Sequence, residues 1–402
     1  MRAASKGPTI MGLGNCVIAG WVLVLASGGA DTRSVAFGQD APIAWSEMEK
    51  FFVPPEQYQG RLGEYRSLMR FDDGTPVNTR QDWPRRREEI LRYWHGVMGP
   101  WPPVVEKPRI KHLDKEHVEN FTRHKVQVEF APSIFASTQY LLVPDGYHPE
   151  GARFPAVLVT WYGSGDSAGL SEKAKGSLDF GYQLAKRGFV TLCIGGEAGA
   201  IGGEGARTAE RDTGTQPLSR LAYAAANCCS ALAGMREVDP RRIGVVGHSF
   251  GGKWAMFASC LYDKFACAVW VDPGIVWNEK DPNANYWEKW YLGYEFDRPA
   301  DKQRTPGVPQ EGNPRTGAYK RLVADGRDLH ELHALMAPRP FLVSGGAQDR
   351  LEHWTALNHA IALNEFLGQT GRVAMTMREG HTPTPQSNAQ VYTFLEHFLK
   401  AH

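Results

Sequence analysis

The pentapeptide Gly247-His248-Ser249-Phe250-Gly251 has the Gly-x-Ser-x-Gly pattern of a nucleophilic serine. It lies between an apolar, strand-like segment (243–246) and a segment with the pattern of a helix (251–261). A serine in the tight turn between a strand and a helix exposes its hydroxyl above the sheet, and the two glycines let strand and helix approach each other. The sequence therefore predicts that Ser249 is the nucleophile of a hydrolase.

A nucleophilic serine needs a histidine as its base and a carboxylate that orients the histidine. In hydrolases of this architecture the three residues follow one another as serine, carboxylate and histidine. His381 follows the strand-like segment 372–377, so it is expected at the edge of the sheet where ligand sites form. We predict His381 as the base and expect structural roles for four others: His330, His333, His353 and His359.

Asp349 is the predicted acid, because it follows the apolar segment 341–344 and so reaches the same edge of the sheet. Two rival carboxylates, Asp272 and Glu279, follow the apolar segment 266–271, and a carboxylate there can also reach the histidine. We predict that Asp349 orients the base, and both rivals stay open.

Backbone N–H groups must stabilise the negative charge that develops on the carbonyl oxygen of the substrate. One donor is expected from Phe250, the residue after the nucleophile, and the other from the loop after the strand-like segment 156–161. Because that loop begins with Tyr162-Gly163, the predicted second donor is Tyr162 or Gly163.

Strand-like and helix-like segments alternate from about residue 156 to the carboxyl terminus. Several of the strand-like segments are continuous apolar runs, which is typical of strands buried on both faces of a parallel sheet. The sequence thus predicts an α/β-hydrolase fold, with a mostly parallel sheet and helices on both faces. Ahead of it, two segments with alternating apolar residues, 126–130 and 140–143, are expected to form an antiparallel pair.

We divide the chain into a signal peptide (1–38), a helical N-terminal extension packed on the main domain (39–115) and an α/β-hydrolase domain (116–402). Residues 272–335 are expected to form an insertion or lid after the sixth predicted strand. The signal peptide is predicted from a basic start, an apolar stretch at 17–26 and small residues after it. Since a membrane span needs about 20 apolar residues, we expect a secreted or periplasmic protein without stable membrane insertion after cleavage.

Charge and motifs exclude several classes of function. The chain has 45 Lys and Arg against 44 Asp and Glu, and this balance argues against a nucleic-acid partner. No Cys-x-x-Cys, His-Glu-x-x-His or EF-hand pattern occurs, and the glycine-rich segment 195–203 fits no nucleotide motif, so neither a metal nor a cofactor is expected. The cysteines after the signal are expected to be buried apolar residues, and one disulfide stays open.

The predicted insertion is rich in aromatic residues beside hydrogen-bonding ones, and its tryptophans include Trp277, Trp287 and Trp290. Aromatic faces next to polar groups suit a sugar ring, which stacks through its C–H faces and needs partners for its hydroxyls. The same aromatic residues would equally serve as the core of a packed lid. Both interpretations stay open here.

The chain resembles bacterial carbohydrate esterases of the α/β-hydrolase superfamily, above all glucuronoyl esterases and the related acetyl xylan esterases, over roughly residues 120–400. The resemblance lies in residues 247–253 (GHSFGGK), residues 335–343 (LMAPRPFLV) and Gly380-His381. In glucuronoyl esterases an arginine that helps to hold the oxyanion follows the nucleophile, and a lysine four residues after the serine contacts the sugar. Lys253 matches that lysine, whereas Phe250 stands in place of the arginine.

These observations predict a secreted serine carboxylic-ester hydrolase that forms an acyl-enzyme and acts on a small-molecule or polysaccharide ester. The resemblance implies acetyl or glucuronoyl esters of a polysaccharide. One alternative is a serine peptidase of the prolyl-oligopeptidase type, although about 110 residues ahead of the sheet are too few for a propeller. Another is a carbohydrate-binding protein whose triad is vestigial.

Overall fold

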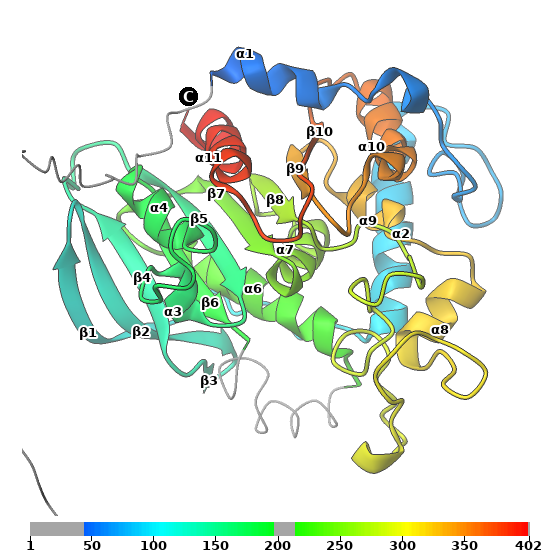
Figure 1. The fold of residues 1–402 in the computed structure, drawn as a ribbon, viewed down its shortest axis with the longest axis horizontal. Helices are drawn as coiled ribbons and strands as arrows, with labels where there is room; N and C mark the ends of the chain where they lie inside the picture. The colour runs from blue at the N-terminus through cyan, green and yellow to red at the C-terminus, as the bar shows by residue number, and fades with distance from the viewer. Residues whose placement is uncertain (1–43, 197–213, 401–402) are drawn as a thin grey trace, which may run out of the picture. The chain divides into compact units, whose positions relative to one another are not determined.

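A computed structural model describes residues 44–196 and 214–400 (Figure 1). The predicted signal peptide and most of the glycine-rich segment 195–203 lie outside the described residues. In the part of the chain that the structure describes, no helix is both long and apolar enough to cross a membrane.

A ten-stranded mixed sheet forms the centre of the molecule, in the order β1-β2-β4-β6-β5-β7-β8-β9-β10, with β3 paired to β2. The strands β1, β2 and β4 pair in antiparallel fashion, β4 joins β6 in the same way, and all pairs from β6 to β10 are parallel. The strands are β1 (Ile110–Val118), β2 (Phe121–Ala131), β3 (Ile134–Phe135), β4 (Gln139–Pro144), β5 (Phe154–Trp161), β6 (Val190–Gly195), β7 (Val238–His248), β8 (Cys267–Val271), β9 (Phe341–Gly345) and β10 (Val373–Met377).

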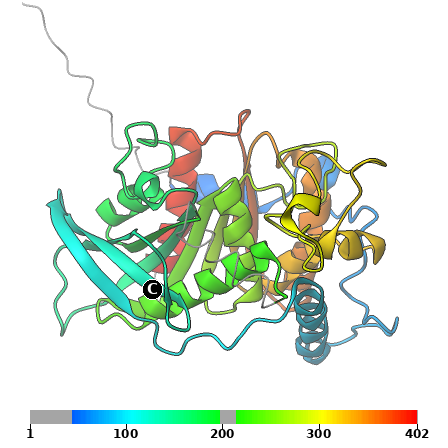
Figure 2. The same cartoon turned by 90° about the horizontal axis from the view of Figure 1, so that it is seen from below.

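Helices cover both faces of the sheet, as Figures 1 and 2 show. One face packs into a core with α2, α6, α7, α9 and α10, and the other packs against α1, α4 and α11. Every residue of β6 and β8 is buried, which is why these segments read as continuous apolar runs. The helices are α1 (Trp45–Met48), α2 (Trp83–Met98), α3 (Ser164–Ser167), α4 (Phe180–Lys186), α6 (Pro217–Ala233), α7 (Phe250–Leu261), α8 (Gly317–Ala324), α9 (His330–Leu335), α10 (Trp354–Phe366) and α11 (Pro385–Lys400).

The N-terminal extension differs from its prediction at its carboxyl end. It was expected to stay helical and irregular to residue 115, but β1 already begins at Ile110. This edge strand has the sequence IKHLDKEHV, and its seven central residues are exposed. With no buried face, it lacks the alternation of polar and apolar residues that identifies a half-buried strand.

The insertion after β8 is packed on the domain and contains α8, α9 and a short 3₁₀ helix (Ala300–Lys302). Several of its aromatic residues belong to the main core: Tyr286 and Trp287 are fully buried, and Trp277 packs against this core. Five described cysteines are buried and free, as expected for small apolar residues, and they are Cys193, Cys228, Cys229, Cys260 and Cys267.

Candidate active site

Ser249 occupies the tight turn between β7 and α7. Its backbone has φ 55° and ψ −113°, a strained combination for a residue with a side chain, and its N–H donates to the carbonyl oxygen of Val271 at 2.8 Å. A Cβ atom on Gly247 or Gly251 would overlap neighbouring backbone atoms, so only glycine fits there. This is the geometry that the pentapeptide predicts for an exposed nucleophile.

His381 lies on the loop after β10, and its Nδ1 donates to Oδ2 of Asp272 at 2.6 Å. Asp272 is the first residue after β8, is fully buried and also has a positive φ of 51°. Its other oxygen, Oδ1, accepts the backbone N–H groups of Gln348 at 3.0 Å and Asp349 at 2.9 Å. A carboxylate fixed in this way holds the histidine with Nε2 free to accept a proton.

The prediction that Asp349 orients His381 is wrong. Both oxygens of Asp349 instead accept backbone N–H groups at the start of the insertion, from Gly274 at 2.9 Å and Ile275 at 2.6 Å. Asp349 also faces Nδ1 of His353 at 3.3 Å. Asp349 is on the expected strand end, but its side chain anchors the insertion.

Of the two rival acids, the structure favours the one nearer to β8. Asp272 contacts the histidine, whereas Glu279 lies seven residues further along the insertion and binds Arg315 at 2.5 and 2.6 Å. Glu279 also accepts the hydroxyl of Tyr319 at 2.9 Å. It is therefore engaged in an ion pair within the insertion.

Two side chains that the sequence analysis did not assign hold the His381 loop. His248 donates from Nε2 to the carbonyl oxygen of His381 at 2.9 Å, and Arg378 donates to the same oxygen at 2.5 Å. Burial and the neighbouring His381 lower the pKa of His248 to about 3, so this ring is neutral. Their positions, directly before the nucleophile and three residues before the base, are the only sequence signal for this role.

The predicted oxyanion donors lie next to each other. Phe250 is the first residue of α7, Tyr162 follows β5, and Gly163 precedes the first turn of α3. The rings of Tyr162 and Phe250 stack with their centroids 4.6 Å apart and an angle of 22° between their planes. The structure thus brings the loop after β5 against the residue after the nucleophile, and the donor roles stay predictions.

Lys253 does not lie where the predicted contact with a sugar requires it. It is 1% exposed, and its Nζ donates to the carbonyl oxygens of Pro273 at 2.5 Å and Asn283 at 3.1 Å. Burial lowers its pKa to about 8, although Asp349 and Asp272 act against this shift. The ammonium group therefore ties the insertion to α7 and is not presented to a substrate.

The three tryptophans predicted to bind substrate separate into two groups. Trp287 is fully buried and donates to the carbonyl oxygen of Gly307 at 2.7 Å, and Trp277 donates to that of Arg327 at 2.7 Å. Trp287 belongs to the core, so the prediction that it stacks on a sugar is wrong. Trp277 is partly buried and packs against the same core, and its contact with a substrate stays a prediction. Trp290 is 41% exposed and remains available to a ligand.

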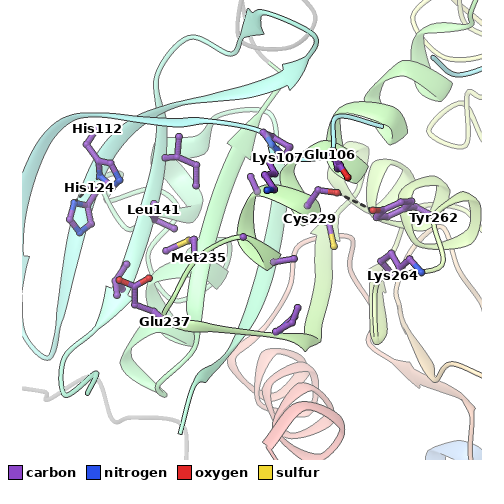
Figure 3. Close-up of a pocket in the computed structure, with 18 residues that line it drawn as sticks. Glu106, Lys107, His112, His124, Leu141, Cys229, Met235, Glu237, Tyr262 and Lys264 are labelled. Carbon is purple, nitrogen blue, oxygen red and sulfur yellow. Dashed lines mark hydrogen bonds between the residues drawn. The ribbon is translucent and has the colours of Figure 1, made fainter. Parts of the chain in front are cut away.

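A separate cavity of about 780 Å³ lies between the antiparallel strands and the carboxyl end of α6 (Figure 3). Figure 3 shows His112 and His124 on one side of it and Tyr262 and Lys264 on the other. None of the residues of the Ser249 site lines this cavity. It plays no part in the chemistry of that site.

The fold and the site together define a serine hydrolase of the α/β-hydrolase type. Residues 177–402, more than half of the chain, match the model of the prolyl oligopeptidase family. The chain belongs to this family. No curated protein matches the sequence.

Solved structures with a similar fold include several carbohydrate esterases. A glucuronoyl esterase from Solibacter usitatus superposes with a TM-score of 0.63 at 19% identity, covering 85% of this chain and 99% of that one. A glucuronoyl esterase of carbohydrate esterase family 15 from Teredinibacter turnerae has a TM-score of 0.59 and 18% sequence identity, and the match covers 82% of this chain and 88% of that one. A promiscuous esterase of the same family from a marine bacterial metagenome has a TM-score of 0.60 and 17% sequence identity, and the match covers 85% of this chain and 99% of that one. These similarities confirm the predicted fold.

Proposed function

We propose that this protein is a carboxylic-ester hydrolase that works through a Ser249–His381–Asp272 triad. The observation that carries the proposal is the contact of 2.6 Å between His381 Nδ1 and the buried Asp272, on the same sheet edge as the strained turn of Ser249. This arrangement supplies the nucleophile, the base and the group that orients the base.

In the proposed reaction the Ser249 hydroxyl attacks the ester carbonyl carbon while His381 Nε2 takes its proton. The N–H groups of Phe250 and of Tyr162 or Gly163 stabilise the resulting oxyanion. His381 then gives the proton to the departing alkoxide, so that an alcohol leaves and an acyl-enzyme remains. Water, deprotonated by His381, attacks the acyl-enzyme and releases a carboxylic acid and free Ser249.

For the substrate we propose an ester on a polysaccharide, acetyl or glucuronoyl being the candidates. The similar structures named above include glucuronoyl esterases, and they support the proposal only through their fold. The exposed ring of Trp290 offers a stacking face for a sugar. It lies two ring contacts from Phe250, through Tyr291, with centroid distances of 6.2 Å in each step.

A peptidase is the second candidate, because the matching family is named for prolyl oligopeptidase. The same triad chemistry cleaves esters and amides, so the site itself does not separate the two. Between residues 44 and 109 the structure contains α1, α2 and three 3₁₀ helices, but no strand. This part of the chain therefore forms no propeller, which needs blades of four strands.

Labelling with a fluorophosphonate tests the mechanism directly, with the Ser249→Ala variant as the control. We expect stoichiometric labelling of Ser249 in the wild type and none in the variant. Acetylated xylan, a methyl glucuronoyl ester and a proline-containing peptide then separate the substrates. Cleavage of the peptide without hydrolysis of either ester would favour the peptidase.

We also propose that the protein is exported to the periplasm or the medium, on the strength of the basic start and the short apolar stretch at 17–26. N-terminal sequencing of the mature protein from the producing cells tests this proposal. A mature chain that still begins at residue 1 or 2 would contradict it.

A further inference from the structure

We infer that Thr160 is a positioning residue which, together with the stacked rings of Tyr162 and Phe250, fixes the spacing of the two backbone N–H groups that hold the oxyanion. This role rests on the proposed function, which assigns the donors to Phe250 and to Tyr162 or Gly163. Thr160 lies near the end of β5, two residues before the loop that supplies one of the donors.

The end of β5 and the first turn of α7 approach each other backbone to backbone. Thr160 lies opposite Gly247 in the parallel register of β5 and β7. A Cβ atom on Gly251 would lie 1.9 Å from the carbonyl oxygen of Thr160, so this glycine is what allows α7 to come so close to β5. The two segments that carry the proposed donors are therefore in direct contact, and a shift between them changes the distance between the donors.

The hydroxyl of Thr160 joins these two segments. Thr160 is 1% exposed, and its Oγ1 donates to the carbonyl oxygen of Gly251 at 2.7 Å and lies 3.3 Å from that of Val246. Gly251 follows the donor residue Phe250 by one position, and Thr160 precedes Tyr162 by two. One buried hydrogen bond thus connects the two segments right beside the donors.

The rings of Tyr162 and Phe250 form a second connection between the same segments. Their centroids lie 4.6 Å apart, with an angle of 22° between the ring planes. Because both rings belong to residues whose backbone N–H groups are proposed donors, their stacking restricts the same separation as the Thr160 hydrogen bond.

The spacing matters because donors stabilise an oxyanion fully only when they lie about 2.7–3.1 Å from it. Displacing a group by about 1 Å in an active site can cost about 10²-fold in rate. Formation and hydrolysis of the acyl-enzyme both pass through an oxyanion, so a change of spacing slows both steps. We therefore expect loss of the Thr160 hydroxyl to lower kcat at an unchanged KM.

Exchanges of Thr160 test this role, since they leave the backbone donors themselves in place. Thr160→Val keeps the shape of the side chain but removes the hydroxyl, and should lower kcat for p-nitrophenyl acetate by about 10- to 100-fold at an unchanged KM. The inhibition constant of a trifluoromethyl ketone, whose adduct with Ser249 carries an oxyanion, should rise by a similar factor. Thr160→Ser, which keeps the hydroxyl, should recover most of both losses.

Thr191→Val is the matched control. Thr191 in β6 is fully buried and donates to the carbonyl oxygen of Gly181 at 3.1 Å, so its exchange also takes a hydroxyl away from a buried backbone acceptor. We expect a similar loss of stability in urea, but wild-type kcat and a wild-type inhibition constant. Equal losses of kcat in Thr160→Val and Thr191→Val, or equal losses in Thr160→Val and Thr160→Ser, would overturn the inference.

Tyr162→Leu tests the second connection on a side chain that is 44% exposed, where folding is not at risk. It should lower kcat and weaken the ketone by up to about 10-fold, the upper end of what one aromatic stacking contact supplies. Tyr162→Phe, which keeps the ring, should recover most of this loss. Wild-type values in Tyr162→Leu would contradict the inference even if Thr160→Val did not fold.

Failure of the positioning role can be told apart from failure of the proposed function. A wild type that hydrolyses p-nitrophenyl acetate and is labelled at Ser249, beside a fully active Thr160→Val variant, would refute the role of Thr160 and leave the ester hydrolase standing. No hydrolysis and no labelling in the wild type would refute both.

Discussion

The exchange Asp272→Asn should abolish most of the activity by giving His381 the wrong tautomer. In the native site Oδ1 of Asp272 accepts two backbone N–H groups, from Gln348 and Asp349. An asparagine must keep its oxygen at that position, so its NH₂ group turns toward His381 Nδ1. The histidine then carries its proton on Nε2 and cannot accept one from Ser249.

The expected loss in kcat is about 10⁴-fold, as for the equivalent exchange in other serine hydrolases, or about 5.5 kcal/mol of transition-state stabilisation. The matched variant is Asp349→Asn, which also replaces a fully buried carboxylate by an amide. It removes charge-assisted bonds to Gly274 and Ile275 but does not touch His381. We expect a stability loss of about 2 kcal/mol and a fall in kcat of less than about 10-fold.

The assay combines kcat for p-nitrophenyl acetate, the rate of fluorophosphonate labelling and urea unfolding for the wild type and both variants. We expect the Asp272→Asn variant to be folded but to label slowly. We expect the Asp349→Asn variant to be active but less stable than the wild type. The reverse order, with Asp349→Asn losing 10³-fold or more and Asp272→Asn less than 10-fold, would refute the assignment of Asp272 as the acid.

Two further exchanges test the packing around the site, and a third tests a buried histidine of α9. Gly346→Ala would place a Cβ 2.8 Å from Oδ2 of Asp272 and 2.5 Å from a backbone oxygen. We expect kcat to fall by about 10- to 100-fold because the carboxylate of Asp272 is displaced. Circular dichroism checks that the variant is folded. Lys253→Met leaves two carbonyl oxygens without their donor and should lower the free energy of unfolding, measured by urea titration, by about 2 kcal/mol. The control Lys264→Met, on the surface, should change the free energy of unfolding by less than about 0.5 kcal/mol. Equal effects of the two exchanges would contradict the role of the buried ammonium group. Burial lowers the pKa of His330 from 6.5 to about 3, so as the pH falls below 6.5 the unfolded chain binds a proton at this residue before the folded chain does. The free energy of unfolding should therefore fall by about 2 kcal/mol between pH 7 and pH 5 from this group alone. His330→Gln should make the free energy of unfolding depend less on pH over this range.

The fold, the tight turn at Ser249 and the position of His381 on the loop after β10 could be predicted from the sequence, because each depends on local pattern. The sequences of buried parallel strands such as β6 are nearly continuous apolar runs, and the turn at Ser249 requires glycines at fixed spacing. The edge strand β1 was missed, since both of its faces are mostly exposed and its side chains carry no periodic signal.

Which aspartate contacts His381, and which atoms Lys253 binds, depends on long-range contacts that cannot be seen in a local sequence pattern. Asp272 and Asp349 both follow strands that end at the same edge, and only the left-handed backbone of Asp272 turns its carboxylate toward His381. Lys253 was assigned to a ligand on a motif position, but residues 20 and 30 places further along the chain supply its two acceptors.

In the proposed mechanism, the hydrogen bonds between the two aspartates and their backbones would link the insertion to catalysis. Asp349 donates its backbone N–H to the Asp272 carboxylate, and its own carboxylate holds Gly274 and Ile275, which follow Asp272 by only two and three residues. The residue that anchors the insertion therefore also helps to fix Asp272, the proposed acid, and Lys253 holds the same stretch of chain from α7. A change that loosens residues 273–283 should reach His381 through Asp272, so variation in the insertion can alter the rate as well as the choice of substrate.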